Sequence, residues 1–219
     1  MNTRTHRTLL SIALPLLAAL AGCNIVAPIA LAFEPPPSRE AATKLDTSRT
    51  HVFFVDDRSS IMPKRSLRAV IGRTAEERLI RREMLKPDMV VPSAQATRVV
   101  EYESNESPLS IADIGRKVGA EIVVYLTIDR WSLTRDGSSP APTARARVKI
   151  IDALDNERVF PESDTGHPIT VRMPTRPGQV PRDRVERGQL ENELARALGI
   201  ELARVFFKHE IDPMTNRRL

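Results

Sequence analysis

The sequence contains one cysteine, few aromatic residues and only nine glycines, and each shortage excludes a class of protein. With Cys23 as the single cysteine, the chain cannot form an intramolecular disulfide even in an oxidising compartment. Aromatic residues make up 4% of the chain, and its lysines and arginines are mixed with acidic residues, whereas nucleic-acid readers combine clustered basic residues with stacking aromatics. We therefore expect no nucleic-acid partner.

Motifs for metals, phosphates and nucleophilic catalysis are also missing from the sequence. None of the four histidines lies at metal-ligand spacing from another histidine or from the cysteine. The glycines form no phosphate-cradling run, and Ser59 and Ser60 do not lie in a G-x-S-x-G segment. The sequence indicates no metal, no cofactor and no small-molecule substrate.

The one long apolar run lies at the amino terminus. Arg4 and Arg7 precede an apolar segment at residues 8–22, which contains Pro15 and ends in small residues. A membrane-spanning helix needs about 20 predominantly apolar residues, whereas a charged start and a shorter apolar segment that ends in small residues are typical of an export signal. We interpret residues 1–22 as a signal peptide.

The lone cysteine follows this signal directly. The stretch LAGC at residues 20–23 resembles the lipobox of bacterial lipoproteins. The resemblance implies cleavage between Gly22 and Cys23, transfer of a diacylglycerol to the Cys23 sulfur, and acylation of the new amino terminus. Several acyl chains on one residue anchor a protein to a membrane without spanning it. The alternative interpretation is a buried structural cysteine.

The residue after the cysteine bears on which membrane holds the anchor. In enterobacterial lipoproteins an aspartate at this position is the retention signal for the inner membrane, and this chain has Asn24 instead. The resemblance therefore favours an outer-membrane anchor, with the folded part in the periplasm.

The rest of the chain divides into a spacer, a domain and a tail. Residues 23–50 include a triple proline at 35–37 and then a polar segment, and proline runs favour extended polyproline II geometry. We expect a lipidated, semi-rigid tether over residues 23–50, a single domain over residues 51–212 and a flexible tail over residues 213–219. Loss of two arginines with the signal lowers the formal net charge from +5 to about +3, which implies no strong polyanion partner.

Apolar periodicity predicts the elements of this domain. Along the chain these are a buried strand at residues 52–55, a helix at 66–85 with Gly72 inside it, a strand at 88–91, a short helix at 93–100, a helix at 111–118, a long strand at 120–133, an alternating strand at 144–150, a strand at 157–160, an edge strand at 169–173 and a C-terminal helix. Ser110 and Gly119 suit the two caps of helix 111–118. Gly188 and Gly199 interrupt the last helix, which carries its leucines on one face.

This order of elements predicts an α/β fold, or its α+β variant. The helix at residues 111–118 feeds directly into a strand, which is typical of layered α/β arrangements. We expect a single two- or three-layer domain, with a mixed sheet of about four to five strands packed by helices and a C-terminal helix.

Two stretches carry a resemblance to known envelope domains. IADIGRKVGAEIVVYLTI at residues 111–128 and KIIDALDNERV at 149–159 resemble blocks in curli-secretion lipoproteins, the amino-terminal domain of TolB and the lipoprotein activators of penicillin-binding proteins. Such short motifs encode packing, so the resemblance implies the fold more than the function. Curli pores add long alternating membrane hairpins, and the only long strand, at residues 121–133, is uniformly apolar at its start. We therefore expect no pore.

Asp56 and Asp57, at the end of the first strand, are the most enzyme-like feature. Strand-end carboxylates serve as nucleophiles or Mg²⁺ ligands in phosphoryl-transfer folds, but this pair lacks Asp-x-Asp spacing, and aspartates also end strands by accepting hydrogen bonds from turn amides. We favour the turn interpretation and keep a Mg²⁺-dependent hydrolase as the alternative.

Two aromatic residues of the long strand have two possible roles. Tyr125 and Trp131 are either a contact for a partner or part of the core and the sheet face, and the second role is the more common.

These observations favour a membrane-anchored periplasmic lipoprotein that serves as a non-enzymatic accessory or adaptor. Its partner is expected to be an envelope protein in transport, secretion or cell-wall synthesis. The alternatives are an envelope hydrolase that uses Asp56 and Asp57, and a purely structural lipoprotein that oligomerises.

Overall fold

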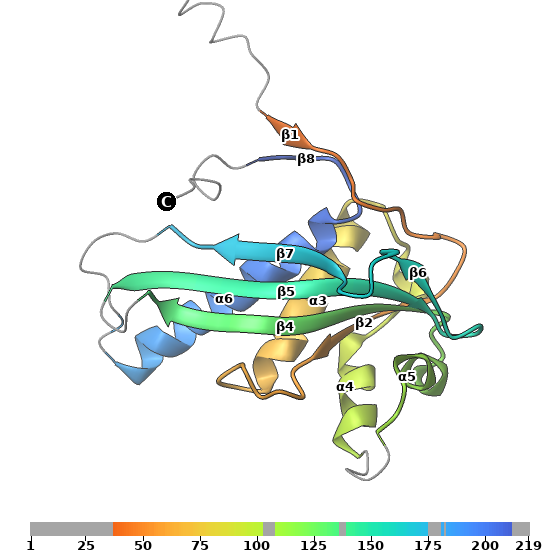
Figure 1. Cartoon of the computed structure of the whole chain (residues 1–219), viewed down its shortest axis with the longest axis horizontal. Coiled ribbons are helices and arrows are strands. Elements are labelled where there is room, and N and C mark those ends of the chain that lie inside the picture. The colour runs from red at the N-terminus through yellow and green to blue at the C-terminus, as the bar shows by residue number, and fades with distance from the viewer. Residues whose placement is uncertain (1–36, 103–107, 136–138, 175–180, 182, 212–219) are drawn as a thin grey trace, which may run out of the picture. The chain divides into compact units, whose positions relative to one another are not determined.

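The computed structural model describes residues 37–102, 108–135, 139–174, 181 and 183–211 of the chain (Figure 1). The predicted signal peptide, Cys23 and the predicted tail lie outside these residues. Within the described part, none of the helices combines the length and the hydrophobicity that a membrane span requires.

The described chain forms one mixed α/β domain, which confirms the predicted fold class (Figure 1). Its elements are β1 (Ser38–Arg39), β2 (His51–Asp56), α3 (Ser66–Arg81), a short 3-10 turn (Pro87–Met89), β3 (Val90–Val91), α4 (Ser93–Glu101), α5 (Ile111–Val118), β4 (Ile122–Thr134), β5 (Pro140–Asp152), β6 (Glu157–Phe160), β7 (His167–Arg172), α6 (Arg184–Arg204) and β8 (His209–Glu210).

The main sheet has the order β3-β2-β4-β5, and both β6 and β7 pair with β5. The strand β2 is parallel to β3 and β4, whereas β4 and β5 form a long antiparallel hairpin. The sheet has six strands, where about four to five were expected, and all six correspond to strand segments predicted from the sequence. The strand β5 is longer than the predicted strand at residues 144–150. Its residues 150–152 pair with β6, while its residues 143–148 pair with β7.

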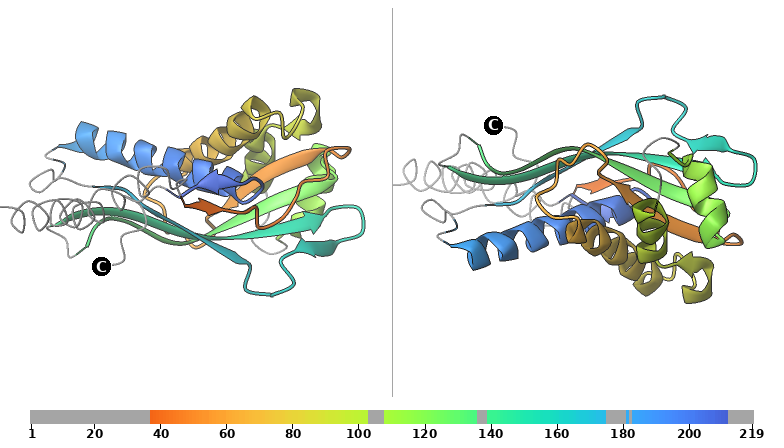
Figure 2. Two further views of the ribbon diagram at one scale, coloured as in Figure 1. Left: turned by 90° about the horizontal axis from the view of Figure 1, so that it is seen from above. Right: turned by 90° about the horizontal axis from the view of Figure 1, so that it is seen from below.

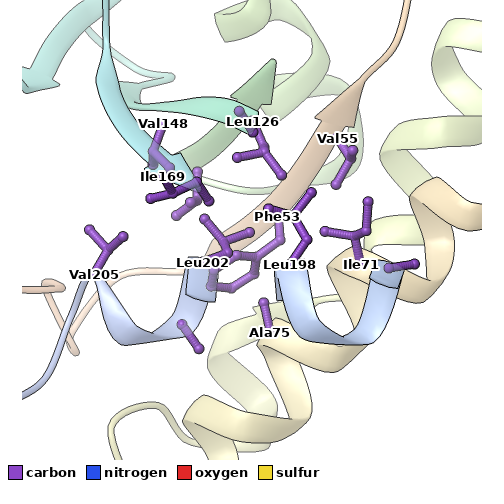
Figure 3. Close-up of a cluster of buried hydrophobic side chains, with 14 of the residues drawn as sticks. Phe53, Val55, Ile71, Ala75, Leu126, Val148, Ile169, Leu198, Leu202 and Val205 are labelled. Atoms are coloured by element: carbon purple, nitrogen blue, oxygen red, sulfur yellow. The ribbon is translucent and has the colours of Figure 1, made fainter. Parts of the chain in front are cut away.

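The sheet has apolar residues on both faces, and β2 contributes to both. Phe53 and Val55 point into the main core, where the face of β4, β5 and β7 packs against α3 and α6 (Figures 2 and 3). Val52 and Phe54 point into a second, smaller core with residues of α4 and α5. All six residues of β2 are buried, as expected for its short apolar run.

Two helices run without a break through glycines that the sequence marks as interruptions. A Cβ atom at Gly199 in α6 would lie 2.5 Å from the Ile71 carbonyl oxygen of α3, and one at Gly72 would lie 2.6 Å from the Ser93 side chain of α4. Both glycines therefore permit close helix contacts and do not end the helices. The helix α3 stops at Arg81, earlier than predicted, because the chain turns at Glu83, whose φ is 56°.

The caps predicted for α5 are confirmed. The Ser110 hydroxyl accepts a hydrogen bond from the Asp113 amide at 3.1 Å, and Gly119 ends the helix with a left-handed φ of 76°.

The segment before β2 contacts the domain, although residues 38–50 fall within the expected tether. The two-residue strand β1 pairs with β8, and the Ala42 amide donates to the Val205 carbonyl at 2.8 Å. Arg49 donates two hydrogen bonds to the Asp152 carboxylate, at 2.6 and 3.0 Å. These contacts arise from residues far apart in the chain, which local composition does not show.

The close contact of α3 and α6 can be tested at Gly199. We expect Gly199→Ala to lower the free energy of unfolding by about 1–3 kcal/mol, because the added methyl group would overlap with backbone. The matched variant Gly188→Ala, in the same helix, would meet only the end of the Lys64 side chain and should be neutral or stabilising by up to ~1 kcal/mol. Denaturant unfolding followed by circular dichroism measures both, and equal losses would contradict the packing role.

The Arg49–Asp152 pair predicts a pH dependence of stability. The hydrogen bond from Arg49 lowers the pKa of Asp152 from 3.8 to about 2. Because the pKa of Asp152 is lower in the folded state than in the unfolded state, its carboxylate stabilises the fold fully at pH values above the unfolded-state pKa. This contribution is lost as the pH falls from about 4 to about 2. Asp152→Asn should therefore cost about 2 kcal/mol at pH 7 and almost nothing near pH 2.

The control for this prediction is Asp164→Asn, which removes a carboxylate whose side chain is 90% exposed. Unfolding free energies measured from pH 2 to pH 7 should show a pH-dependent difference only for the Asp152 variant. A difference that stays constant down to pH 2 would contradict the assigned pKa.

Candidate functional site

The predicted lipidation residue Cys23 and the cleavage residue Gly22 lie outside the described residues, so their roles stay predictions. Asp56 and Asp57 lie, as expected, at the carboxyl end of β2.

The carboxylate of Asp56 is engaged inside the protein. It is 5% exposed, and it accepts hydrogen bonds from the Tyr125 hydroxyl at 2.5 Å and from the Arg58 amide at 2.9 Å. Burial, together with the hydrogen bond to Asp56, raises the pKa of Tyr125 to about 12. The pair joins β2 to β4 at the point where β2 ends.

Asp57 holds the loop that follows β2. Its Oδ1 atom accepts from the Ile61 amide at 2.7 Å, and its Oδ2 atom accepts from the Met62 amide at 3.1 Å. Ser60, between them, has a positive φ of 51°. The two aspartates therefore organise a turn, and within the described residues no group of three His, Cys, Asp or Glu side chains is arranged to hold a metal ion.

The two aromatic residues of β4 belong to the sheet. Trp131 is half-buried against the main core, and Tyr125 packs against the second core with its ring centroid 5.8 Å from that of Phe54. The core and sheet-face role favoured for them is confirmed.

A basic surface covers the outer face of the β4–β5 hairpin and of β7. In the ladder Arg130 lies opposite Arg145, and Thr143 lies opposite Arg172, so these side chains share one face. The alternate residues of β5 and β7 point into the main core. We call this set the basic face, and it consists of the exposed Arg130, Arg145 and Arg172 and the half-buried Arg147 and Lys149. Of these, Arg147 is neutralised by Asp129, which accepts hydrogen bonds from its guanidinium at 2.6–3.0 Å.

The basic face continues into a groove of ≈ 760 Å³ along β7, which lies at the edge of the sheet. Three parts of the chain line this groove: residues of β1 and the segment after it, the β5–β7 pair, and the carboxyl end of α6 with β8. The charged and titratable groups that line it are Arg39, Glu40, Arg145, His167, Arg172, Glu201, Arg204 and His209.

The acidic residues of the groove are already paired. Glu40 lies 2.7 Å from the Lys208 ammonium, and Glu201 forms a close ion pair with Arg204. Arg39, Arg145 and Arg172, in contrast, form no ion pair with any described residue. The groove thus offers three guanidinium groups for carboxylates, whose geometry they match.

His167 does not add to this charge at neutral pH. Its ring packs against Phe160 with centroids 5.4 Å apart, and burial, with a smaller effect of Arg39, lowers its pKa. The cationic character of the groove therefore depends on its arginines.

Sequence reasoning identified the alternating arginines of residues 144–150 as a half-exposed strand, but it did not find the groove. Arg39, Arg145 and Arg172 are distant in the chain, and only the pairing of β7 with β5 and of β1 with β8 brings them together.

No protein family and no curated protein sequence matches the chain. Several solved structures, including the following three, are similar to it at a low level. The PelC dodecamer from Paraburkholderia phytofirmans has 11% identity and a TM-score of 0.41, over 78% of this chain and 97% of that one. Lipoprotein GNA1162 from Neisseria meningitidis has 13% identity and a TM-score of 0.37, over 59% and 86%.

The hypothetical protein CT253 from Chlamydia trachomatis has 15% identity and a TM-score of 0.34, over 70% of this chain and 98% of that one. Similarities of this size do not establish a shared function. The functional assignment of this chain therefore depends on its own groove and on its own amino terminus.

The Tyr125–Asp56 contact can be tested by titration of the phenols. The chain has two tyrosines, and we expect one of them to ionise near pH 12, measured by ultraviolet absorbance. Tyr125→Phe should remove this step, whereas Tyr102→Phe, which changes a residue that is 90% exposed, should keep it. A step near pH 12 that survives in Tyr125→Phe would contradict the assignment.

Proposed function

We propose that the chain is a lipid-anchored protein of the bacterial envelope and that its domain is a non-enzymatic adaptor. The lipobox resemblance at residues 20–23 supports the anchor, and the Asn24 position favours the outer membrane. The acyl chains on Cys23 would hold the domain close to the membrane surface, where partner proteins of the envelope are found.

The observation that carries the adaptor function is the groove along β7 with its three unpaired arginines. An edge strand presents unpaired backbone groups, to which an extended segment of another protein adds as a further strand. Arg145 and Arg172 lie on the basic face, and Arg39, from β1, lines the same groove. The chemistry therefore suits an acidic, extended segment of a partner protein.

The hydrolase alternative gains nothing from the geometry. Both oxygens of Asp57 accept hydrogen bonds from backbone amides, and Asp56 is occupied by Tyr125 and Arg58. These structural donors occupy the oxygens that a nucleophile or a metal ligand would present. The adaptor function uses arginines of the groove that pair with no acidic side chain in the part of the chain that the structure describes.

Site-specific crosslinking in the groove tests this proposal. A photoreactive amino acid at Thr170, which is exposed and lines the groove, should crosslink the membrane-anchored chain to a protein at an acidic peptide, identified by mass spectrometry. The double variant Arg145→Glu and Arg172→Glu should lower the crosslink yield roughly tenfold, which corresponds to about 1.4 kcal/mol of binding.

The matched control is Arg81→Glu, which reverses an exposed charge at the end of α3 and should leave the crosslink intact. Cys23→Ser should release the chain from the membrane fraction. A crosslink to a second copy of this chain would support the oligomeric alternative. A crosslink yield that stays the same in the Arg145→Glu and Arg172→Glu double variant would overturn the proposed partner chemistry. A crosslink to polysaccharide would also overturn it.

A further inference from the structure

The side chain of Arg68 is a buried charge without a partner. The residue is 7% exposed, its Nε atom is enclosed without a hydrogen-bond partner, and its guanidinium forms no ion pair with any described residue. Burying an unpaired charge is costly, and most buried ionisable groups avoid this cost by becoming neutral. Arginine cannot become neutral in a protein. A bound anion would supply the charge compensation that no described side chain gives to Arg68.

The other buried ionisable groups of the described chain show how unusual this is. Each buried carboxylate has a donor or a cation: Asp56 has Tyr125, Glu76 has the Ser93 amide at 2.7 Å, Asp152 has Arg49, and Glu191 has Lys64 at 2.9 Å. Burial lowers the pKa of His51, so its ring is neutral at neutral pH. Arg78 also has an enclosed Nε atom without a hydrogen-bond partner, but it is only half-buried. Arg68 is the only arginine among the fully buried described residues, and no described side chain compensates its charge.

Arg68 lines a hollow of ≈ 590 Å³ beyond the carboxyl end of β2. The described walls are the loop after β2, the start of α3, the last turn of α4 and Pro108. In open α/β sheets ligands bind beyond the carboxyl ends of the strands. The charged groups that face the hollow are Asp57, Arg58, Arg65, Arg68 and Glu101.

The two acidic residues of the hollow do not serve Arg68. The carboxylate oxygens of Asp57 accept hydrogen bonds from the amides of Ile61 and Met62. Glu101 forms no ion pair with a described residue. Because an ion pair requires oxygen and nitrogen within 4 Å, neither carboxylate lies close enough to Arg68 to neutralise it.

The start of α3 adds a second feature that attracts an anion. The amino end of a helix carries a partial positive charge, and it normally has an acidic residue or a capping side chain. At α3 the amides of Leu67 and Arg68 already donate to the carbonyls of Lys64 and Arg65, so the attraction for an anion comes from the charge of this end. The helix α3 has no acidic residue in its first turn and no side-chain hydrogen bond at its N-cap, Arg65. Two arginines, Arg65 and Arg68, occupy this end instead. Their repulsion from the helix end is relieved by an anion at the same place.

From these observations we propose that the hollow between β2, α3 and α4 binds a phosphate group, with Arg68 as its buried anchor and Arg65 as its exposed one. The planar fork of Arg68 suits two oxygens of a phosphate, and the α3 amino end suits its charge. The molecule that carries this phosphate group is either a soluble phosphate compound or a phospholipid, through its head group. None of the residues that line this hollow lines the groove along β7, so the two sites can fail independently.

Thermal unfolding of the full chain in nonionic detergent, followed by circular dichroism, tests this site. Inorganic phosphate is added at constant ionic strength, with acetate as the comparison anion, and phosphatidylglycerol is added to the same micelles in a separate arm. We expect phosphate to raise the unfolding temperature, because a ligand that binds only the folded state stabilises it. Acetate should not raise it.

The variant Arg68→Met keeps much of the side-chain volume and removes the charge. We expect it to unfold at a higher temperature than the natural chain when phosphate is absent, and to lose roughly ten- to a hundredfold in phosphate affinity. Arg68→Lys should lose less, because it keeps the charge without the fork. Arg81→Met, at the other end of α3, should bind phosphate as the natural chain does.

The possible outcomes distinguish a soluble phosphate ligand from a lipid head group, and they include results that would overturn the proposal. A shift with inorganic phosphate supports a soluble ligand, and a shift only with phosphatidylglycerol supports a lipid head group. Equal shifts in the natural chain and in Arg68→Met, equal shifts with acetate, or no shift in any arm would overturn the proposal. If Arg68→Met does not fold, Arg65→Gln provides the test, because Arg65 is exposed and its loss should still weaken phosphate binding.

Discussion

The complete burial of β2 is the constraint on which the rest of the domain depends. Its alternate side chains enter two separate cores, so the strand needs helices on both sides of the sheet. The helix α3 covers one side, with α6 packed tightly upon it at Gly199, and α4 and α5 supply the other. The same burial brings the loop after β2 under the ends of α3 and α4. The position of the hollow that contains Arg68 thus follows from how β2 is enclosed.

Most of the acidic side chains discussed above form hydrogen bonds or ion pairs within the protein. Fewer carboxylates are therefore left to neutralise the arginines of its surface. Asp56 and Asp57 hold a turn, Asp152 holds the segment before β2, and the glutamates of the groove are paired with neighbouring cations. Several arginines therefore have no ion-pair partner among the described residues, and two groups of them line the groove and the hollow. Net charge alone predicts no anionic partner, whereas the distribution of paired and unpaired charges favours two kinds of anion.

The bounds of a helix or strand could be predicted where a local sequence pattern sets them. They could not be predicted where a contact with a distant part of the chain sets them. Ser110 and Gly119 carry their cap chemistry within a few residues, so the bounds of α5 follow from the sequence. Gly199 looks like a helix break until Ile71 is seen against it. The strand β5 extends past its alternating arginines, because β6 and β7 both pair with it along its length.

By itself the sequence determined the α/β class and most of the helices and strands, because apolar periodicity and caps are local properties, and it predicts an export signal with a lipobox resemblance. Only the tertiary structure decided which charges remain without partners. The groove needs residues from β1, β5 and β7 side by side, and the hollow needs the first turn of α3 against the last turn of α4. Whether an arginine is buried, paired or free depends on neighbours that are distant in the chain, and no local pattern encodes that arrangement.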